Sequence, residues 1–124
     1  MGNMLRLSAA GLVLVGALAA VLLNMAPLWV LAAYLMLGVV SFGVYGFDKR
    51  AARRGEWRVA EASLHWIDAI GGIAGGLIGQ VVFRHKTRKE GFVAITALIA
   101  VAHIVALALL VAGLWRVPEL LFAS

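Results

Sequence analysis

Three ionisable side chains lie at helical spacing in a stretch that is otherwise almost apolar. Glu61, His65 and Asp68 follow one another at steps of four and three residues, so they share one face of an α-helix. Such a face could carry a proton, act as an acid–base pair, or bind a metal together with His85, and Asp68 would lie deepest in a membrane, where charge is costly. The structural alternative, which we favour, is that Glu61 stabilises a helix start and His65 bonds a carbonyl. No strong metal signature is present, so we predict neither metal nor cofactor.

The second group is the basic run Arg84-His85-Lys86-Thr87-Arg88-Lys89. Its simplest role is to hold a loop on the cytoplasmic side of a membrane. Its order also suits an anionic group, with Arg84 as a bidentate donor and Lys86 as a point charge. The predicted anion-binding set is Arg58, Arg84, His85, Lys86 and Lys89. No aromatic residues alternate with these charges to stack bases, so nucleic acid is a disfavoured partner.

Two further polar positions border the apolar stretches. Asp48 and Lys49 follow the apolar stretch 28–47. A carboxylate at the C-terminus of a helix is unfavourable unless a cation pairs with it. We therefore predict a structural polar cap that joins Asp48 and Lys49 to the basic residues of both loops. His103, inside the last apolar stretch, is expected to bond to a neighbouring helix.

The elements that hold these residues have the composition of a membrane protein. The 124 residues are 64% hydrophobic and only 14% charged, with a mean hydropathy of +0.99. Soluble domains are about 45–50% apolar and about 25% charged. The chain has no cysteine, which excludes disulfides, thiolate chemistry and Cys-based metal sites. We expect a single membrane domain.

Three stretches have the length of a membrane span, and they are 7–23, 28–47 and 91–115. Each is near the roughly 20 apolar residues that cross a bilayer. We interpret the first as a span rather than a signal peptide, because no A-x-A cleavage site follows it and a second span comes at once. The basic loops 48–58 and 84–90 flank the remaining stretch.

That remaining stretch, 59–83, decides the topology. If it crosses as one helix, its basic flanks fall on opposite sides, against the tendency of short cytoplasmic loops to carry Lys and Arg. If it turns back near Gly71-Gly72, ten of the eleven Lys and Arg residues face the cytoplasm and only Arg116 lies outside. The glycines that would form the hinge or a helix-packing face are Gly71, Gly72, Gly75 and Gly76.

We therefore predict an all-α integral membrane protein with three transmembrane helices plus a Gly-rich re-entrant helical hairpin. Four transmembrane helices are the alternative. The expected location is a bacterial cytoplasmic (inner) membrane, with a cytoplasmic N-terminus.

Several short strings carry a family resemblance: Tyr45-Gly46-Phe47-Asp48-Lys49, Trp57-Arg58-Val59-Ala60-Glu61, Gly71-Gly72 with Gly75, and Phe83-Arg84-His85-Lys86-Thr87-Arg88-Lys89. From about Gly38 to Leu98 the chain resembles a bacterial membrane family of unknown function, domain-of-unknown-function family 1294. It departs from the family pattern at Ala60 and Ala74, where relatives commonly have proline. Some relatives carry a cold-shock domain ahead of the membrane part. The resemblance implies a membrane location and no established activity.

From these features we expect an inner-membrane binding or accessory protein. Its basic cytoplasmic cap would recognise anionic lipid headgroups or a partner membrane protein. The alternative is a membrane-embedded enzyme or proton-coupled carrier that uses Glu61, His65 and Asp68. In either case these three should point into the bundle, toward the end of the second apolar stretch and the basic run 84–89. Glu61 should lie within hydrogen-bonding reach of a basic residue, with Arg58, Arg84 or His85 the first candidates. The Gly-rich faces are also compatible with a homodimer.

Overall fold

The chain folds into long apolar helices around one short, broken pair. The computed structural model describes residues 1–55, 60–84 and 90–122. Its elements are α1 (Asn3–Leu22), α2 (Leu28–Arg54), α3 (Glu61–Ile67), the π-helical turn η1 (Asp68–Gly72), α4 (Ile73–Phe83), α5 (Glu90–Val111) and the 3₁₀ turn η2 (Glu119–Phe122). No strand occurs in these described residues, so the all-α class is confirmed.

Four helical stretches are long and apolar enough to cross a membrane, namely α1, α2, α5 and the combined stretch Glu61–Phe83. Their outer surface is apolar too. Met36 is 71% exposed, Val39 is 73% exposed and Leu98 is 70% exposed. A surface of this kind suits hydrocarbon rather than water.

The largest difference from the predicted boundaries is at the end of α2. This helix ends at Arg54 rather than near residue 47, so the first part of the predicted loop 48–58 is helical. Arg53 and Arg54 stabilise the last turn because cations interact favourably with a helix C-terminus. Gly55 then ends the helix in the left-handed conformation, with φ 67°. The predicted stretch ended before the first charged residue, Asp48, because its boundary was set by hydropathy and not by helix propensity.

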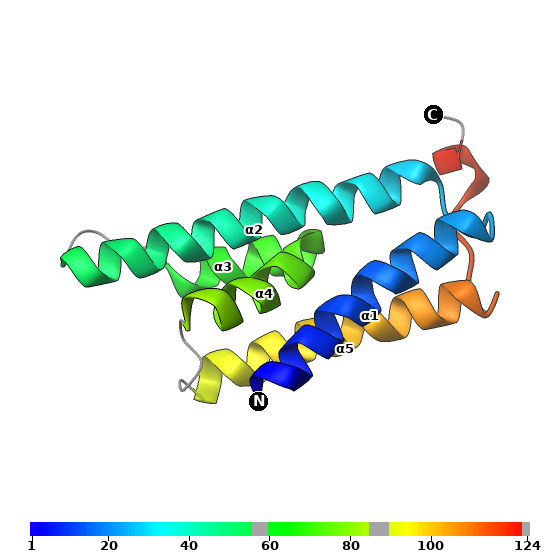
Figure 1. The fold of residues 1–124 in the computed structure, drawn as a ribbon. Helices are drawn as coiled ribbons and strands as arrows, with labels where there is room; N and C mark the ends of the chain where they lie inside the picture. The colour runs from blue at the N-terminus through cyan, green and yellow to red at the C-terminus, as the bar shows by residue number, and fades with distance from the viewer. Residues whose placement is uncertain (56–59, 85–89, 123–124) are drawn as a thin grey trace.

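The stretch from Glu61 to Phe83 is not one straight helix. Gly71 has φ 138° and ψ −5°, a conformation open to glycine alone. In a straight helix Asp68 and Gln80 would lie about 18 Å apart, yet both bond to the hydroxyl of Tyr45. The chain therefore reverses at Gly71, and α3 and α4 run in opposite directions. Figure 1 shows them as two short arms that start and finish at the same end of the bundle.

α4 runs beside α2 in the same direction, with glycines at the contact. A Cβ atom on Gly75 would overlap the backbone carbonyl of Gly38. One turn further on, Gly79 faces Tyr45. Of the predicted glycine set, Gly71 therefore provides the reversal, whereas Gly75 allows two helix backbones to touch, as small residues do between membrane helices.

α1 covers the other side of α4 with a small-residue face. Ala9, Ala10, Val13 and Ala17 of α1 pack in one core cluster with Ile73, Ala74 and Leu77 of α4 and with Ala100 and Leu107 of α5. Ala10, Val13 and Ala17 follow one another at steps of three and four residues, which places them on one side of the helix. The α3–α4 pair thus sits between α2 on one side and α1 with α5 on the other.

The two ends of the bundle differ in charge. We call one the basic end. There α2 ends, α3 begins, α4 ends and α5 begins (Figure 1), and it carries Arg50, Arg53, Arg54 and Arg84, all exposed. At the opposite end η2 returns to the start of α2, where Trp29 Nε1 donates to the Leu121 carbonyl at 2.8 Å.

Replacing Gly75 with alanine tests the backbone contact between α2 and α4. The added methyl group meets backbone atoms of Gly38, which cannot rotate away. We expect the free energy of unfolding in detergent to fall by about 1–3 kcal/mol.

The matched control is Gly43→Ala on α2, because nothing lies within 4 Å of a Cβ at that position. Alanine is the better helix former by roughly 1 kcal/mol, so this variant should keep or gain stability. Equal stability of the two variants would contradict the close contact.

Candidate functional site

A buried carboxylate lies just before the chain reversal. Asp68 Oδ1 accepts a hydrogen bond from Ser41 Oγ at 2.6 Å, and Oδ2 accepts one from Tyr45 Oη at 2.9 Å. A Cβ atom on Gly76 would lie 2.7 Å from Asp68 Cγ, so only glycine leaves room for this carboxylate. The hydrogen bonds of Asp68 thus tie the broken pair to α2.

Gln80 continues the polar contacts from α4 across the bundle. Its Nε2 donates to Tyr45 Oη and to Thr96 Oγ1, each at 3.3 Å. Its Oε1 accepts from Arg6 Nε at 3.0 Å. The Arg6 guanidinium also donates to the backbone carbonyl of Met1 through Nη1. One amide therefore links side chains from α1, α2 and α5.

These contacts form one continuous set, which we call the polar chain: Arg6, Ser41, Tyr45, Asp68, Gln80 and Thr96. Each member is at most 1% exposed. In a membrane an unsatisfied polar group costs several kcal/mol, so such groups bond to one another. The polar chain has a cation at one end and a carboxylate at the other, and it joins every long helix to the α3–α4 pair.

Glu61 and His65 lie nearer the basic end on the same side of α3. Both are half-buried, with Glu61 Oε1 and His65 Nδ1 shielded from solvent. The His65 ring packs on Phe92 with centroids 4.2 Å apart. Asp68 bonds to α2 instead, as described above. Of the basic residues considered for Glu61, Arg58 and His85 lie outside the described residues.

His103 has two partners, as predicted for a histidine bonded to a neighbouring helix. Nε2 lies 2.9 Å from the Ala69 carbonyl, and Nδ1 lies 2.7 Å from Tyr34 Oη. A carbonyl only accepts, so Nε2 carries the proton and the tyrosine hydroxyl donates to Nδ1. Within residues 1–55, 60–84 and 90–122 no cluster of three or more His, Cys, Asp or Glu side chains could hold a metal.

A cationic cavity opens where α2 and α4 end. We call it the basic pocket, and its lining is Lys49, Arg53, Val82, Phe83 and Arg84. Its volume is about 410 Å³. Arg53 and Arg84 are exposed and Lys49 is half-buried. Of the predicted polar cap, Lys49 lines the pocket and Asp48 is fully buried.

Arg84 is the one member of the predicted anion-binding set within the described ranges. Arg58, His85, Lys86 and Lys89 lie outside them. Arg84 ends α4 with φ 49° and ψ 45°, the left-handed conformation usually left to glycine. Its neighbour Arg53 was not predicted, because the sequence reading treated residues 48–58 as a loop rather than as the last turns of a helix.

The prediction from sequence also missed most of the polar chain. Ser41, Tyr45, Gln80 and Thr96 are neutral, so a search for charged groups passes over them. The signal that finds them is a polar side chain inside an apolar stretch, which is costly unless it is bonded.

The fold and these contacts define a small all-helical protein with membrane-length helices, a buried polar chain and a basic pocket. The model of a family described as "Protein of unknown function (DUF1294)" matches residues 38–92. Uncharacterized protein YsdA of Bacillus subtilis is 41% identical over 64 residues, which are 51% of this chain and 72% of that protein. The chain belongs to the DUF1294 family. No solved structure matches it.

The family match bears on the site in two ways. Residues 38–92 include Ser41, Tyr45, Asp68 and Gln80, together with the whole basic pocket. Arg6 and Thr96 lie outside the matched residues. The matched segment thus holds the carboxylate end of the polar chain, and the cation comes from α1.

Replacing Tyr45 with phenylalanine tests the polar chain. The ring is kept and the hydroxyl is lost, so Asp68 loses one donor and Gln80 loses one acceptor in a fully buried setting. We expect the free energy of unfolding to fall by about 1–3 kcal/mol.

Tyr34→Phe is the comparison, because it removes one hydroxyl bonded to the half-buried His103. Its loss should be smaller than that of Tyr45→Phe when both are measured by thermal unfolding in the same detergent. A Tyr45→Phe protein as stable as the wild type would show that the polar chain contributes little.

Proposed function

We propose that this protein is a membrane binding module that holds the anionic headgroup of a lipid in the basic pocket. The observation that carries the proposal is the convergence of Lys49, Arg53 and Arg84 on one cavity of about 410 Å³. Within the described ranges none of these three cations is paired with a carboxylate. A compact phosphate can accept hydrogen bonds from two guanidinium groups and one ammonium group together.

The backbone of Arg84 supports the same site. A non-glycine residue in the left-handed region costs about 1 kcal/mol, and glycine would end α4 without that cost. Strain of this kind is retained where the side chain has a task. At this position the task is to bring a guanidinium to the mouth of the pocket.

The place of the pocket favours a lipid over other anions. It lies at the end of apolar, membrane-length helices, where headgroups are concentrated. Basic residues near an anionic membrane surface gain about 1 kcal/mol each. A concave cationic pocket also fits a compact headgroup better than it fits the surface of a partner protein.

The contacts of Asp68 support a structural role for this residue. Each of its oxygens accepts a hydrogen bond from a hydroxyl group of α2, and these bonds hold the α3–α4 pair against that helix. We therefore place the function at the basic pocket rather than at Glu61, His65 and Asp68.

We propose further that the α3–α4 pair is re-entrant and that the basic end faces the cytoplasm. Among the described residues, Arg50, Arg53, Arg54 and Arg84 are exposed at the basic end, whereas Arg116 lies at the opposite end. The eleven residues of α4 extend about 16 Å, roughly half of the 30 Å hydrocarbon core. Gly71 and Gly72 at the reversal are buried in protein, as a break within a membrane requires.

Single cysteines test this topology, because the chain has none of its own. Arg50→Cys and Gly91→Cys should both react with an impermeant maleimide from the cytoplasmic side. Leu114→Cys, which is 74% exposed at the opposite end, should react from the periplasmic side. Labelling of Arg50→Cys and Gly91→Cys from opposite sides would show that Glu61–Phe83 spans the membrane.

Neutralising the basic pocket tests headgroup binding. We expect Arg53→Gln to weaken retention of phosphatidylglycerol relative to phosphatidylcholine by about 1 kcal/mol at low salt. Salt should screen this difference. The measurement is native mass spectrometry of the purified protein after exchange of both lipids.

Arg50→Gln is the matched control, since it removes the same charge from an exposed site on α2 outside the pocket lining. Arg84→Gly is a second test variant. It removes a pocket cation and relieves the left-handed strain, so lipid retention should fall while stability holds or rises. Equal losses for Arg50→Gln and Arg53→Gln would leave only a general surface-charge effect.

A further inference from the structure

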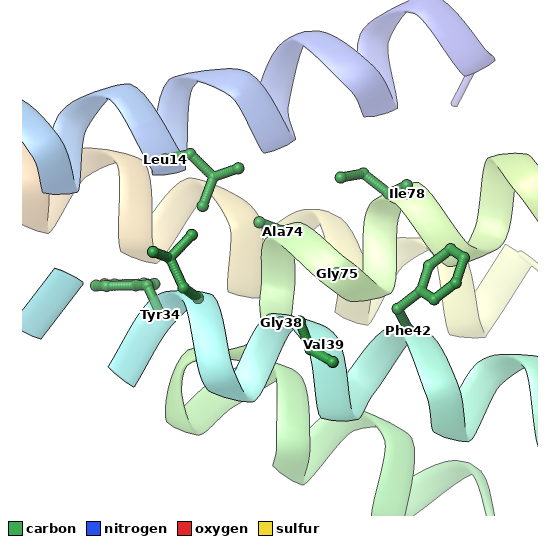
Figure 2. A pocket seen from close by; sticks show the side chains of 9 residues that line it. Leu14, Tyr34, Gly38, Val39, Phe42, Ala74, Gly75 and Ile78 are labelled. Carbon is green, nitrogen blue, oxygen red and sulfur yellow. The ribbon is translucent and has the colours of Figure 1, made fainter. Parts of the chain in front are cut away.

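An apolar groove runs along the same two helices as the basic pocket. Leu35, Val39 and Phe42 of α2 line it with Ala74 and Ile78 of α4, and Leu14 of α1 forms the opposite wall. Figure 2 shows the groove between α1 and α2, with α4 as its floor. Its volume is about 240 Å³. Leu35 is 50% exposed and Val39 is 73% exposed, so the groove opens to the outer surface.

The apolar groove and the basic pocket lie on one stripe of α2. From Leu35 the lining residues continue through Val39 and Phe42 to Lys49 and Arg53, at steps of three, four or seven residues. Residues at these steps share a helix face. On α4, the lining residues Ala74, Ile78 and Val82 are likewise four residues apart.

An aromatic contact links the linings of the two cavities. Phe42 lines the groove, Phe83 lines the pocket, and their ring centroids are 4.9 Å apart. Phe83 can lie across α2 because residue 46 is glycine, where a Cβ atom would fall 2.8 Å from the ring. The linings of the groove and the pocket therefore touch through apolar side chains.

Between Lys49 and Leu35, this stripe has the length of one leaflet of a bilayer. From Lys49 to Leu35 α2 rises about 21 Å at 1.5 Å per residue. A whole bilayer with its headgroups is about 40–45 Å thick. This stripe has a cationic site at one end and apolar side chains along the rest. It is therefore complementary to a single anionic lipid molecule.

We infer that the apolar groove holds one acyl chain of the same lipid whose headgroup occupies the basic pocket. This inference rests on the proposed function and adds the second half of the ligand. An acyl chain is already in hydrocarbon when it lies in the bilayer, so the groove adds packing rather than a hydrophobic gain. Its effect is therefore to hold a lipid in place, and the sharpest test is where the chain lies.

The test uses the full-length protein in phosphatidylcholine nanodiscs that contain a trace of phosphatidylglycerol with a diazirine on one acyl chain. After irradiation, peptide mass spectrometry locates the label. We expect it to concentrate on Leu35, Val39 and Ile78. A phosphatidylcholine probe with the same diazirine chain should label the groove weakly. Label spread evenly over the outer faces of all helices would overturn the inference.

Two valines side by side provide a matched pair of variants. Val39→Trp fills the groove from an exposed position, whereas Val40→Trp adds the same bulk at an exposed neighbour that does not line it. Val39→Trp should lower groove labelling about threefold, the scale of a packing contact without a hydrophobic gain. Val40→Trp should leave labelling unchanged. Equal labelling of the two variants would also overturn the inference.

The acyl-chain inference can fail while the proposed function stands, and a different result overturns both. If Arg53→Gln lowers phosphatidylglycerol retention but the label avoids the groove, the headgroup site stands and the acyl-chain site is wrong. If the label concentrates in the groove with both the phosphatidylglycerol and the phosphatidylcholine probes, and Arg53→Gln leaves retention unchanged, the groove binds chains without the pocket. That result would overturn the single-lipid inference and the proposed function together.

Discussion

The structure depends on providing hydrogen-bond partners for a buried arginine and a buried aspartate in an apolar interior. Arg6 and Asp68 are each at most 1% exposed, and isolated charges in such a setting are among the most costly features a membrane protein can contain. Gln80 bonds to Arg6, Tyr45 bonds to Asp68, and Gln80 and Tyr45 bond to one another. The solution needs side chains from α1, α2, η1, α4 and α5 at the same time. The polar chain is therefore what gives the bundle one arrangement instead of several.

Hydrocarbon packing alone would not fix that arrangement. Lipid tails are as apolar as leucine, so helices in a bilayer gain little by hiding leucines from lipid. What α2 and α4 gain is close approach, because Gly75 lets the backbone of α4 touch that of α2 at Gly38. The approach brings the hydroxyls of Ser41 and Tyr45 within bonding distance of Asp68. Small residues and polar bonds are thus two parts of one contact.

The sequence predicted the helical class, the long apolar helices and a special role for Gly71, because length, hydropathy and glycine content report these directly. It placed the end of α2 too early, since hydropathy falls at Asp48 while the helix continues to Arg54. It found Arg84 but not Arg53, because the pocket depends on how α2 and α4 are aligned. It grouped Asp68 with Glu61 and His65 by spacing along one helix. Asp68 bonds to α2, in the direction that was expected, but periodicity within one helix could not identify Ser41 and Tyr45 as its partners.

The reversal at Gly71 also bears on how the chain is assembled in the membrane. On the proposed re-entrant topology, the residues on either side of the α3–α4 pair stay at one end of the bundle and need never be carried to the opposite end. The pair does, however, bring a carboxylate and an amide into the interior, where neither finds water. Asp68 receives its hydrogen bonds from α2, whereas Gln80 bonds to Arg6 of α1, to Tyr45 of α2 and to Thr96 of α5, which follows it in the chain. Docking of the pair onto α1 and α2 should therefore accompany its insertion, and α5 should complete the polar chain.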